Sequence, residues 1–318
     1  MAVDVDNGYD AFSLDNTRRT LSDEPGRDRQ ETAAASLQWT AEREALTVEA
    51  TVTAASTDTE YSFDEDWSFV GIAPELEYSS FDRYLRDRDS NSAQLRLLSS
   101  ERSRLFGGRG DWAVGVYHLA DREDLLRQYT YLASDFASSY NTDTSAVFGQ
   151  LDTALSDTLT LVTGLRLEQR RTDYRDSNGV SHRRSRDLWG ARLLLEYQQP
   201  EGALFYAGVS RGYRGNGVNA GILASVETTT DPALQQRLEG LGRFDEETLL
   251  NYEAGYKASY AGGSLQARLA LFYMDREDQQ VKGSLVLPRD DGSTAFIDYT
   301  NNAARGTNYG LELELDWL

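Results

Sequence analysis

Residues 250–260 read Leu-Asn-Tyr-Glu-Ala-Gly-Tyr-Lys-Ala-Ser-Tyr, and this stretch decides the fold class. Every even position is apolar or aromatic, and every odd position is polar or glycine. Successive side chains of a β-strand point to opposite faces of a sheet, whereas a helix repeats every 3.6 residues. The stretch is therefore predicted to be a strand with one apolar face and one polar face.

The same two-residue alternation recurs along the chain, in residues 46–52, 159–168, 189–197, 265–274 and 308–317. The 26 glycines against 5 prolines suit long strands joined by tight turns, because proline cannot donate to a sheet ladder. About twelve strands result, all antiparallel. Their predicted ranges are 8–16, 33–40, 45–54, 92–100, 111–119, 146–155, 159–170, 188–197, 203–213, 248–260, 265–283 and 294–317.

Alternation alone fits a soluble β-sandwich equally well, and the connections separate the two folds. Short turns at 41–44, 101–110, 156–158, 198–202 and 261–264 alternate with long polar stretches at 17–32, 55–91, 120–145, 171–187, 214–247 and 284–293. An up-and-down membrane barrel requires short periplasmic turns and long extracellular loops, and a sandwich does not. Aromatic residues also end the apolar faces, as an interfacial girdle would: Trp189, Tyr197, Tyr260, Tyr273 and Trp317. The sequence predicts an all-β, up-and-down transmembrane barrel, with a short helix at 231–241.

Composition excludes several other classes of protein. The net charge of -20 disfavours a nucleic-acid partner, and the absence of cysteine excludes disulfides and thiolate chemistry. The sequence contains no run of about 18 apolar residues, so it predicts no membrane-spanning helix. Residues 1–6 resemble no secretory signal, so we expect either a cytosolic chain or one that begins inside a longer gene product.

No catalytic, cofactor or metal motif is found. His118 and His182 lie in different segments without metal-ligand spacing, and Asp64-Glu65-Asp66 lacks the calcium-loop pattern. An outer-membrane barrel enzyme would need a Ser-His or Asp-His constellation, which neither histidine offers. We expect no enzyme activity, no cofactor and no bound metal.

Five segments, in order, resemble the TonB-dependent receptors. They are residues 145–151 with 159–166, residues 205–215, Phe244-Asp245-Glu246-Glu247-Thr248 with 251–257, residues 272–280, and Asn301-Asn302-Ala303 with 309–314. Glu246 stands where the family usually has proline. The resemblance covers about residues 92–318, and residues 1–91 agree in their alternation only.

The resemblance implies an active-transport receptor of the Gram-negative outer membrane. Its ligand would be scarce, most commonly an iron–siderophore complex, with cobalamin or glycans as other classes, and the TonB–ExbB–ExbD complex would energise import. Residues 1–318 would form a partial barrel of about 12 of 22 strands, without the plug domain or the C-terminal strands. A plug-less diffusion pore or an adhesive barrel is the alternative.

Two groups of residues are the candidate sites. Arg211, Tyr213, Arg214 and Asn216 offer two guanidiniums and a phenol at the mouth of a long loop, where an anionic chelate could bind. Glu253, Lys257, Glu312 and Glu314 lie on polar strand faces, and the resemblance implies that they line the lumen and contact the plug.

Overall fold

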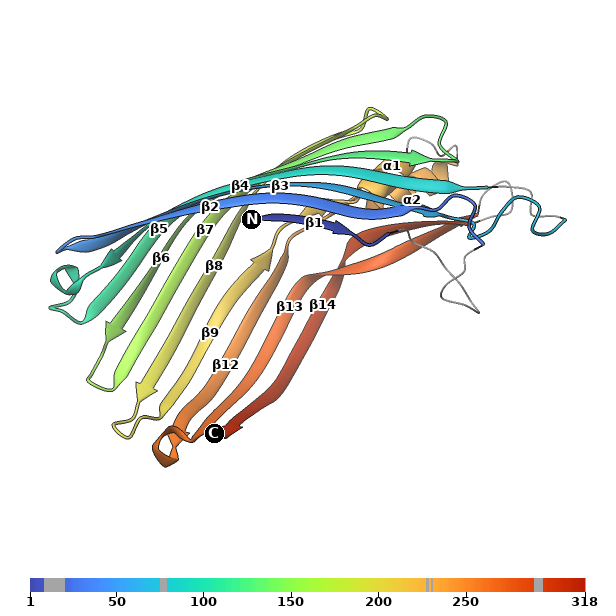
Figure 1. Cartoon of the computed structure of the whole chain (residues 1–318). Helices are drawn as coiled ribbons and strands as arrows, with labels where there is room; N and C mark the ends of the chain where they lie inside the picture. Colours follow the sequence, from blue (N-terminus) through green and yellow to red (C-terminus); the bar gives the residue numbers. More distant parts are fainter. Residues whose placement is uncertain (9–20, 75–78, 227–228, 230, 289–293, 318) are drawn as a thin grey trace.

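The computed structural model describes residues 1–8, 21–74, 79–226, 229, 231–288 and 294–317. Within these residues, one antiparallel sheet contains twelve strands in the order β1-β2-β3-β4-β5-β6-β7-β8-β9-β12-β13-β14 (Figure 1). The strands are β1 Ala2–Asp6, β2 Arg27–Glu42, β3 Leu46–Asp64, β4 Phe81–Ser99, β5 Gly110–Tyr129, β6 Phe136–Ala154, β7 Leu159–Asp176, β8 Ser181–Gln198, β9 Leu204–Arg214, β12 Glu247–Tyr260, β13 Leu265–Pro288 and β14 Thr294–Trp317. Each strand pairs with its neighbours in chain order, which is the predicted up-and-down topology.

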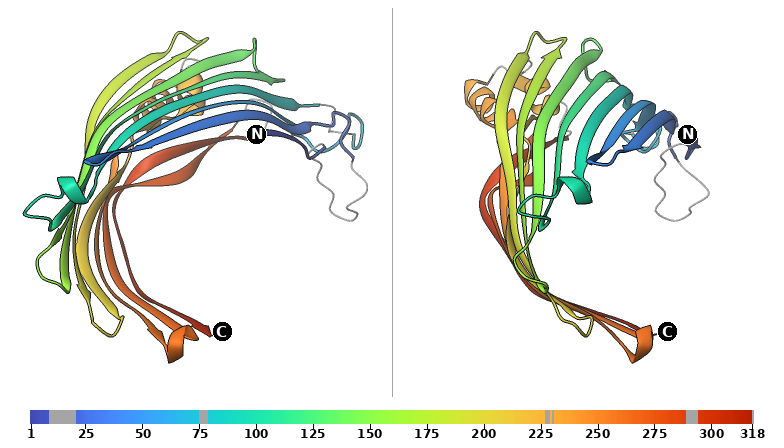
Figure 2. Two further views of the ribbon diagram at one scale, coloured as in Figure 1. Left: turned by 60° about the vertical axis from the view of Figure 1, so that its left-hand side comes forward. Right: turned by 90° about the vertical axis from the view of Figure 1, so that its left-hand side faces the viewer.

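The sheet is strongly curved, so that it forms an open shell rather than a flat layer (Figure 2). In the described part of the chain, β1 and β14 are the two edges of the sheet. No second sheet packs against the apolar face there, and the sandwich alternative is excluded. The fold is that of part of a transmembrane β-barrel.

The register aligns the apolar positions of successive strands into one continuous band. One row of this band, running from β2 to β8, contains Trp39, Ala50, Leu95, Val116, Val147, Leu167 and Trp189. Apolar side chains in this row stay accessible, with Leu167 at 49% and Trp189 at 47%. A sheet that leaves a continuous apolar band accessible needs an apolar solvent on that side, and the bilayer supplies it.

The other face of the sheet is the crowded one. Its side chains on β6–β8 include the buried residues Thr142, Thr144, Ala146, Thr172, Tyr174 and Leu188. On a curved sheet the side chains of the concave face converge and shield one another, while those of the convex face spread apart. The polar face is therefore the concave, inner face, and the apolar band faces outward.

Most of the predicted long loops are in fact strand. Within the stretches 55–91, 120–145 and 171–187, the connections between strands are only residues 65–80, 130–135 and 177–180. The flanking strands continue into each stretch from both sides. Beyond the bilayer both faces of a strand meet water, so polar residues occupy both faces and the alternation disappears. The predicted strand at 8–16 is wrong at Gly8, which lies outside any strand, and residues 9–16 lie outside the described residues.

The longest connection, between β9 and β12, does form a structured loop. It contains α1 Ala220–Val226, α2 Pro232–Leu241, and a two-stranded sheet of β10 Gly217–Val218 and β11 Arg243–Phe244. The predicted helix at 231–241 is confirmed as α2, which Asp231 caps by accepting a hydrogen bond from Ala233 N. The turns at 101–110 and 261–264 contain the 3₁₀ turns Glu101–Ser103 and Ala261–Gly263. Among the described residues, no helix has the length and apolar content to cross a membrane.

Candidate functional site

The residues predicted to line the lumen lie on the inner face of β12 and β14. Glu253 Oε1 accepts a hydrogen bond of 2.7 Å from Tyr206 Oη, and Glu253 Oε2 accepts one of 3.3 Å from Asn251 Nδ2. Lys257 Nζ lies 5.3 Å from the centre of the Tyr206 ring. Glu253 and Lys257 thus each have a polar or aromatic partner on this face.

The two glutamates of β14 lie beside this group. Glu312 is the cross-strand partner of Ala270, and Glu314 is the partner of Arg268. Arg268 Nη1 lies 3.1 Å from Glu314 Oε2 and 2.7 Å from Asp316 Oδ2. The structure brings Glu253, Lys257, Glu312 and Glu314 onto one patch, and their contact with a plug remains a proposal.

Tyr213 belongs to a polar network that extends across three strands. Its ring lies over Gly190, where an added Cβ would be 3.4 Å from Tyr213 Cε1. Its hydroxyl thereby accepts a hydrogen bond of 3.2 Å from Arg166 Nε. Arg166 also donates to Glu168 Oε2, at 3.0 and 2.5 Å, and its guanidinium lies 5.3 Å from the centre of the Tyr117 ring.

Arg214 and Asn216 follow at the end of β9 and have unused binding capacity. Arg214 is exposed, and its strand partner is Glu247. Asn216 is only 3% exposed, yet its Oδ1 has no hydrogen-bond partner among the described residues. A buried acceptor without a partner costs free energy, and a donor that reached Asn216 Oδ1 would offset that cost.

Arg211 is placed apart from these three residues. Its register partners Ala191 and Leu250 belong to the apolar face, and its guanidinium stacks 4.1 Å above the centre of the Trp189 ring. It also donates to Trp189 O. A guanidinium stacked on a girdle tryptophan matches the way arginine places its charge at a membrane interface. We therefore leave Arg211 out of the candidate ligand site.

Sequence reasoning missed a charged cluster on the extracellular ends of β4 and β5. Arg127 makes a two-pronged ion pair with Asp82, at 2.9 and 2.7 Å, and Tyr84 Oη donates to Asp82 Oδ2 at 2.9 Å. Arg88 pairs with Asp121 in the same two-pronged way, at 3.0 and 2.7 Å. The signal was present as alternating charges in Asp82–Arg88 and Asp121–Tyr129, but the absence of apolar alternation made both segments look like loops.

Asp82 is only 3% exposed, so this ion pair is a fixed part of the wall. Burial raises the pKa of Tyr84, which outweighs the opposing charge of Arg127, and the adjacent carboxylate of Asp82 raises it further. Tyr84 therefore stays a neutral hydrogen-bond donor at physiological pH. Removing one partner would leave a buried charge unpaired, so the primary role of the cluster is to stabilise the fold.

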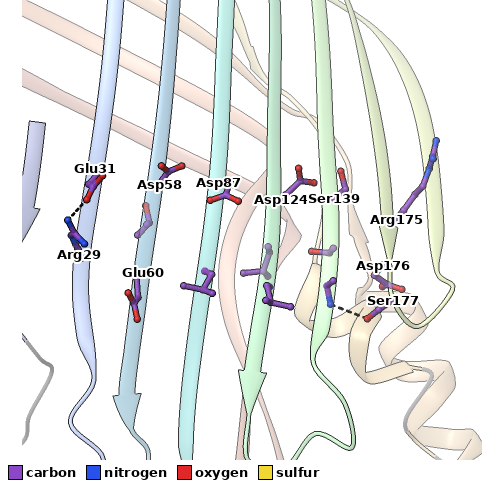
Figure 3. A pocket seen from close by; sticks show the side chains of 16 residues that line it. Arg29, Glu31, Asp58, Glu60, Asp87, Asp124, Ser139, Arg175, Asp176 and Ser177 are labelled. Carbon is purple, nitrogen blue, oxygen red and sulfur yellow. Dashed lines mark hydrogen bonds and ion pairs between the residues drawn. The ribbon is translucent and has the colours of Figure 1, made fainter. Parts of the chain in front are cut away.

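A hollow of about 700 Å³ lies on the other face of the same strand ends (Figure 3). Its carboxylates include Glu31, Asp58, Asp87 and Asp124, and it contains the Arg29–Glu31 ion pair and a hydrogen bond of 3.1 Å from Ala137 N to Ser177 Oγ. By register these residues share the face of the apolar band, farther toward the extracellular ends. The hollow is therefore on the outside of the shell and is not part of a path through the lumen.

His182 lies near the extracellular end of β8, and its pKa gives a testable prediction. Burial, and then the charges of Arg243 and Arg184, lower the pKa of His182 below its ordinary value of 6.5. The folded protein therefore favours the neutral form of His182. The stability that this preference contributes is fully present above pH 6.5, and it is lost as the pH falls through the lowered pKa of the folded state. We expect Arg184→Gln to raise the pKa of His182, measured by NMR titration of its ring protons. Arg102→Gln, at the opposite end of the strands, is the control, and an unchanged titration in Arg184→Gln would contradict this assignment.

The comparison with protein families decides the identity of the fold. The family model described as TonB dependent receptor-like, beta-barrel matches residues 2–318. The chain belongs to the TonB-dependent receptor family. This family consists of outer-membrane transport receptors rather than enzymes.

Solved structures of TonB-dependent receptors share the architecture. The ferric yersiniabactin uptake receptor of Yersinia pestis matches with a TM-score of 0.67 and 19% identity, over 92% of this chain and 41% of that one. The pyoverdine outer-membrane receptor of Pseudomonas aeruginosa, bound to pyoverdine, matches with a TM-score of 0.64 and 14% identity, over 92% and 42%. A copper transporter matches with a TM-score of 0.64 and 14% identity, over 92% and 45%. This chain therefore spans about two fifths to a half of the length of the solved receptors that it matches.

Proposed function

We propose that this chain is part of the barrel wall of an outer-membrane receptor that captures a scarce metal chelate outside the cell and imports it with energy delivered through TonB. The match of the family model to residues 2–318 carries this proposal. Several of the similar structures are named as receptors for ferric siderophores, which makes an iron chelate the first ligand class to test.

The inner face offers a ligand contact of suitable chemistry. Arg214 is an exposed cation that forms no ion pair among the described residues, and Tyr213 and Asn216 lie beside it in the sequence. Ferric siderophores and citrate chelates present carboxylate or phenolate oxygens, which guanidinium and phenol groups bind by charge-assisted hydrogen bonds. We assign Tyr213, Arg214 and Asn216 to the ligand-facing surface, with Glu253, Lys257, Glu312 and Glu314 lining the lumen beneath.

Uptake by cells tests the transport function. Cells with and without the intact full-length gene would receive radiolabelled iron as ferric citrate or as a ferric catecholate, and radiolabelled copper in a third arm. We expect gene-dependent uptake of at least one probe, abolished by deletion of TonB or by collapse of the proton-motive force. Uptake that depends on the gene but survives both treatments would favour the passive pore instead.

A single substitution tests the ligand contact. We expect Arg214→Gln to weaken uptake about tenfold at limiting probe, since a hydrogen bond to a charged group contributes about 1.5–3 kcal/mol. Arg109→Gln is the matched control, because Arg109 is an exposed arginine in the turn at the other end of the strands. Equal uptake by the two variants would remove Arg214 from the ligand site.

A further inference from the structure

In the described part of the sheet, the ladders on both sides of the β9–β12 connection stop before the neighbouring strands β8 and β13 end. β9 ends at Arg214 and β12 begins at Glu247, whereas β8 on one side and β13 on the other continue farther in the extracellular direction. The β8–β9 ladder stops at Ala191, and the β12–β13 ladder stops at Glu277. The loop of residues 215–246, which contains α1 and α2, lies at this end of the shell (Figures 1 and 2).

Gln280 joins the two ends of this loop. Its side-chain Nε2 donates to Gly215 O at 2.8 Å and to Asp245 O at 2.9 Å. Gly215 directly follows β9, and Asp245 lies just before β12, so one amide group bridges the start and the end of the loop. Gln280 is itself held in place, because Glu247 Oε2 accepts its backbone N–H at 2.8 Å and its side chain is 9% exposed.

Two asparagine side chains make hydrogen bonds to backbone groups that have no strand partner in the ladder. Asn302 Oδ1 accepts from Asp245 N at 2.7 Å, and its Nδ2 donates to Asp245 O at 3.1 Å. Asn219 does the same to Thr300, accepting from its N at 2.8 Å and donating to its O at 2.7 Å. A side-chain amide carries the same donor and acceptor as a peptide group, so each asparagine pairs with a backbone as a neighbouring strand would.

Apolar contacts complete the attachment of the loop. Ile222 on α1 and Leu238 on α2 are fully buried, and they cluster with Val226 and with Leu285 of β13. On the other side, Arg184 of β8 pairs with Asp245. The loop is therefore attached to β8 on one side and to β13–β14 on the other, where its apolar core lies.

We propose that Gln280, Asn302 and Asn219 form an amide clasp, and that these positioning residues hold the 215–246 loop in one orientation and so fix the segment that presents Tyr213, Arg214 and Asn216 to the ligand. The link is direct, since Gln280 binds Gly215, which lies between Arg214 and Asn216. Gln280 and Asn302 lie in two of the segments that resemble the receptor family, and the clasp gives their side chains a role. The effect on the ligand rests on the proposed function, but the effect on the loop does not.

The experiment uses the full-length receptor refolded in vesicles, with cysteines for spin labels at Ser185 on β8 and Gln236 on α2, both exposed. This chain has no cysteine of its own, and any elsewhere in the receptor would be replaced by serine. Pulsed electron resonance would give the distance distribution between the labels. We expect one narrow distribution in the parent and a broadened one in Gln280→Met and in Asn302→Leu. Gln280→Asn and Asn219→Ser, which introduce no buried charge, serve where those variants do not fold.

Gln198→Met is the matched control, because Gln198 also donates its side-chain amide to a backbone carbonyl, that of Ala203, but at the opposite end of the strands. Uptake of ferric citrate and of a ferric catecholate is measured for the same variants without labels. We expect KM to rise about tenfold for the probe that the parent takes up, the loss expected from about 1.4 kcal/mol, with an unchanged maximal rate and an unchanged amount of folded receptor.

The outcomes separate the two proposals. A broadened distribution together with a raised KM supports the clasp as a positioning device. An unchanged distribution in folded Gln280→Met and Asn302→Leu overturns the clasp, and a broadened distribution with unchanged KM overturns its role toward the ligand. If the proposed function is wrong, the parent receptor takes up no probe, while its label distances still form one narrow distribution.

Discussion

Replacement of Leu193 by arginine is expected to lower the free energy of unfolding in a bilayer by about 2–4 kcal/mol, the cost of a cation at the middle of a barrel's lipid face. Leu193 lies midway between Trp189 and Tyr197 on β8, on the outward apolar band, and is 48% exposed. Its cross-strand partners are Thr163 and Val209. An arginine at this depth is as far as possible from both interfaces, so its side chain cannot easily place its charge in water.

The measurement is urea unfolding of the full-length receptor in lipid vesicles, followed by tryptophan fluorescence. Thr160→Arg is the control, because Thr160 is on the inner face of β7 and its cross-strand partner is Glu196. We expect this second arginine to change stability by less than about 1 kcal/mol, as a solvated charge pair would. The assignment of the two faces would be refuted if Thr160→Arg were the more damaging of the two.

The fold was predictable wherever the chain crosses the bilayer. Along β7, Leu165 and Leu167 must face lipid while Arg166 and Glu168 face water, so the alternation is imposed by the two solvents. Farther along the same strand, Arg171, Asp173 and Arg175 occupy the outward positions instead of apolar residues. Water lies on both sides of the strand there, so apolar and polar residues do not alternate. From the sequence alone, this part of the strand is indistinguishable from a polar loop.

The candidate site was predictable only in part, for a related reason. Arg211, Tyr213 and Arg214 are adjacent in sequence, and their residue types suggested one anion site. In the structure, Tyr213 reaches Arg166 across Gly190, whereas Arg211 stacks on Trp189 on the other face. Two positions apart, Arg211 and Tyr213 would share one face of a regular strand. The β8–β9 ladder ends at Arg211, and the space above Gly190 then lets the Tyr213 ring turn to the inner face. Neither effect is visible without the cross-strand register.

Gly255→Val is expected to destabilise the receptor by about 3 kcal/mol, because the Tyr206 ring occupies the space where a side chain would begin. A Cβ at Gly255 would lie 2.3 Å from Tyr206 Cζ, and the two residues are direct cross-strand partners. Overpacking costs about 1–3 kcal/mol. Displacing the ring also breaks the hydrogen bond from Tyr206 to Glu253, which contributes about 1.5–3 kcal/mol as a bond to a charged group.

The same pairing of an aromatic ring over a cross-strand glycine recurs in the sheet, at Phe148–Gly115, Phe272–Gly310 and Tyr299–Gly283. At Phe148–Gly115 and Phe272–Gly310 it allows large rings to lie flat on the crowded inner face, and it explains why a strand former is absent from positions such as Gly255. Gly212→Val on β9 is the matched control, since no atom lies within 4 Å of an added Cβ there.

A double-mutant cycle in urea tests the cause directly. If the ring is the obstacle, Tyr206→Ala should remove most of the cost of Gly255→Val, with a coupling energy of about 2–3 kcal/mol. Additive effects, or an equal loss in Gly212→Val, would show instead that backbone flexibility and not space determines the glycine. The ring-over-glycine pairs would then have no part in setting the strand register, and that register is what places Glu253 and Lys257 on the inner face.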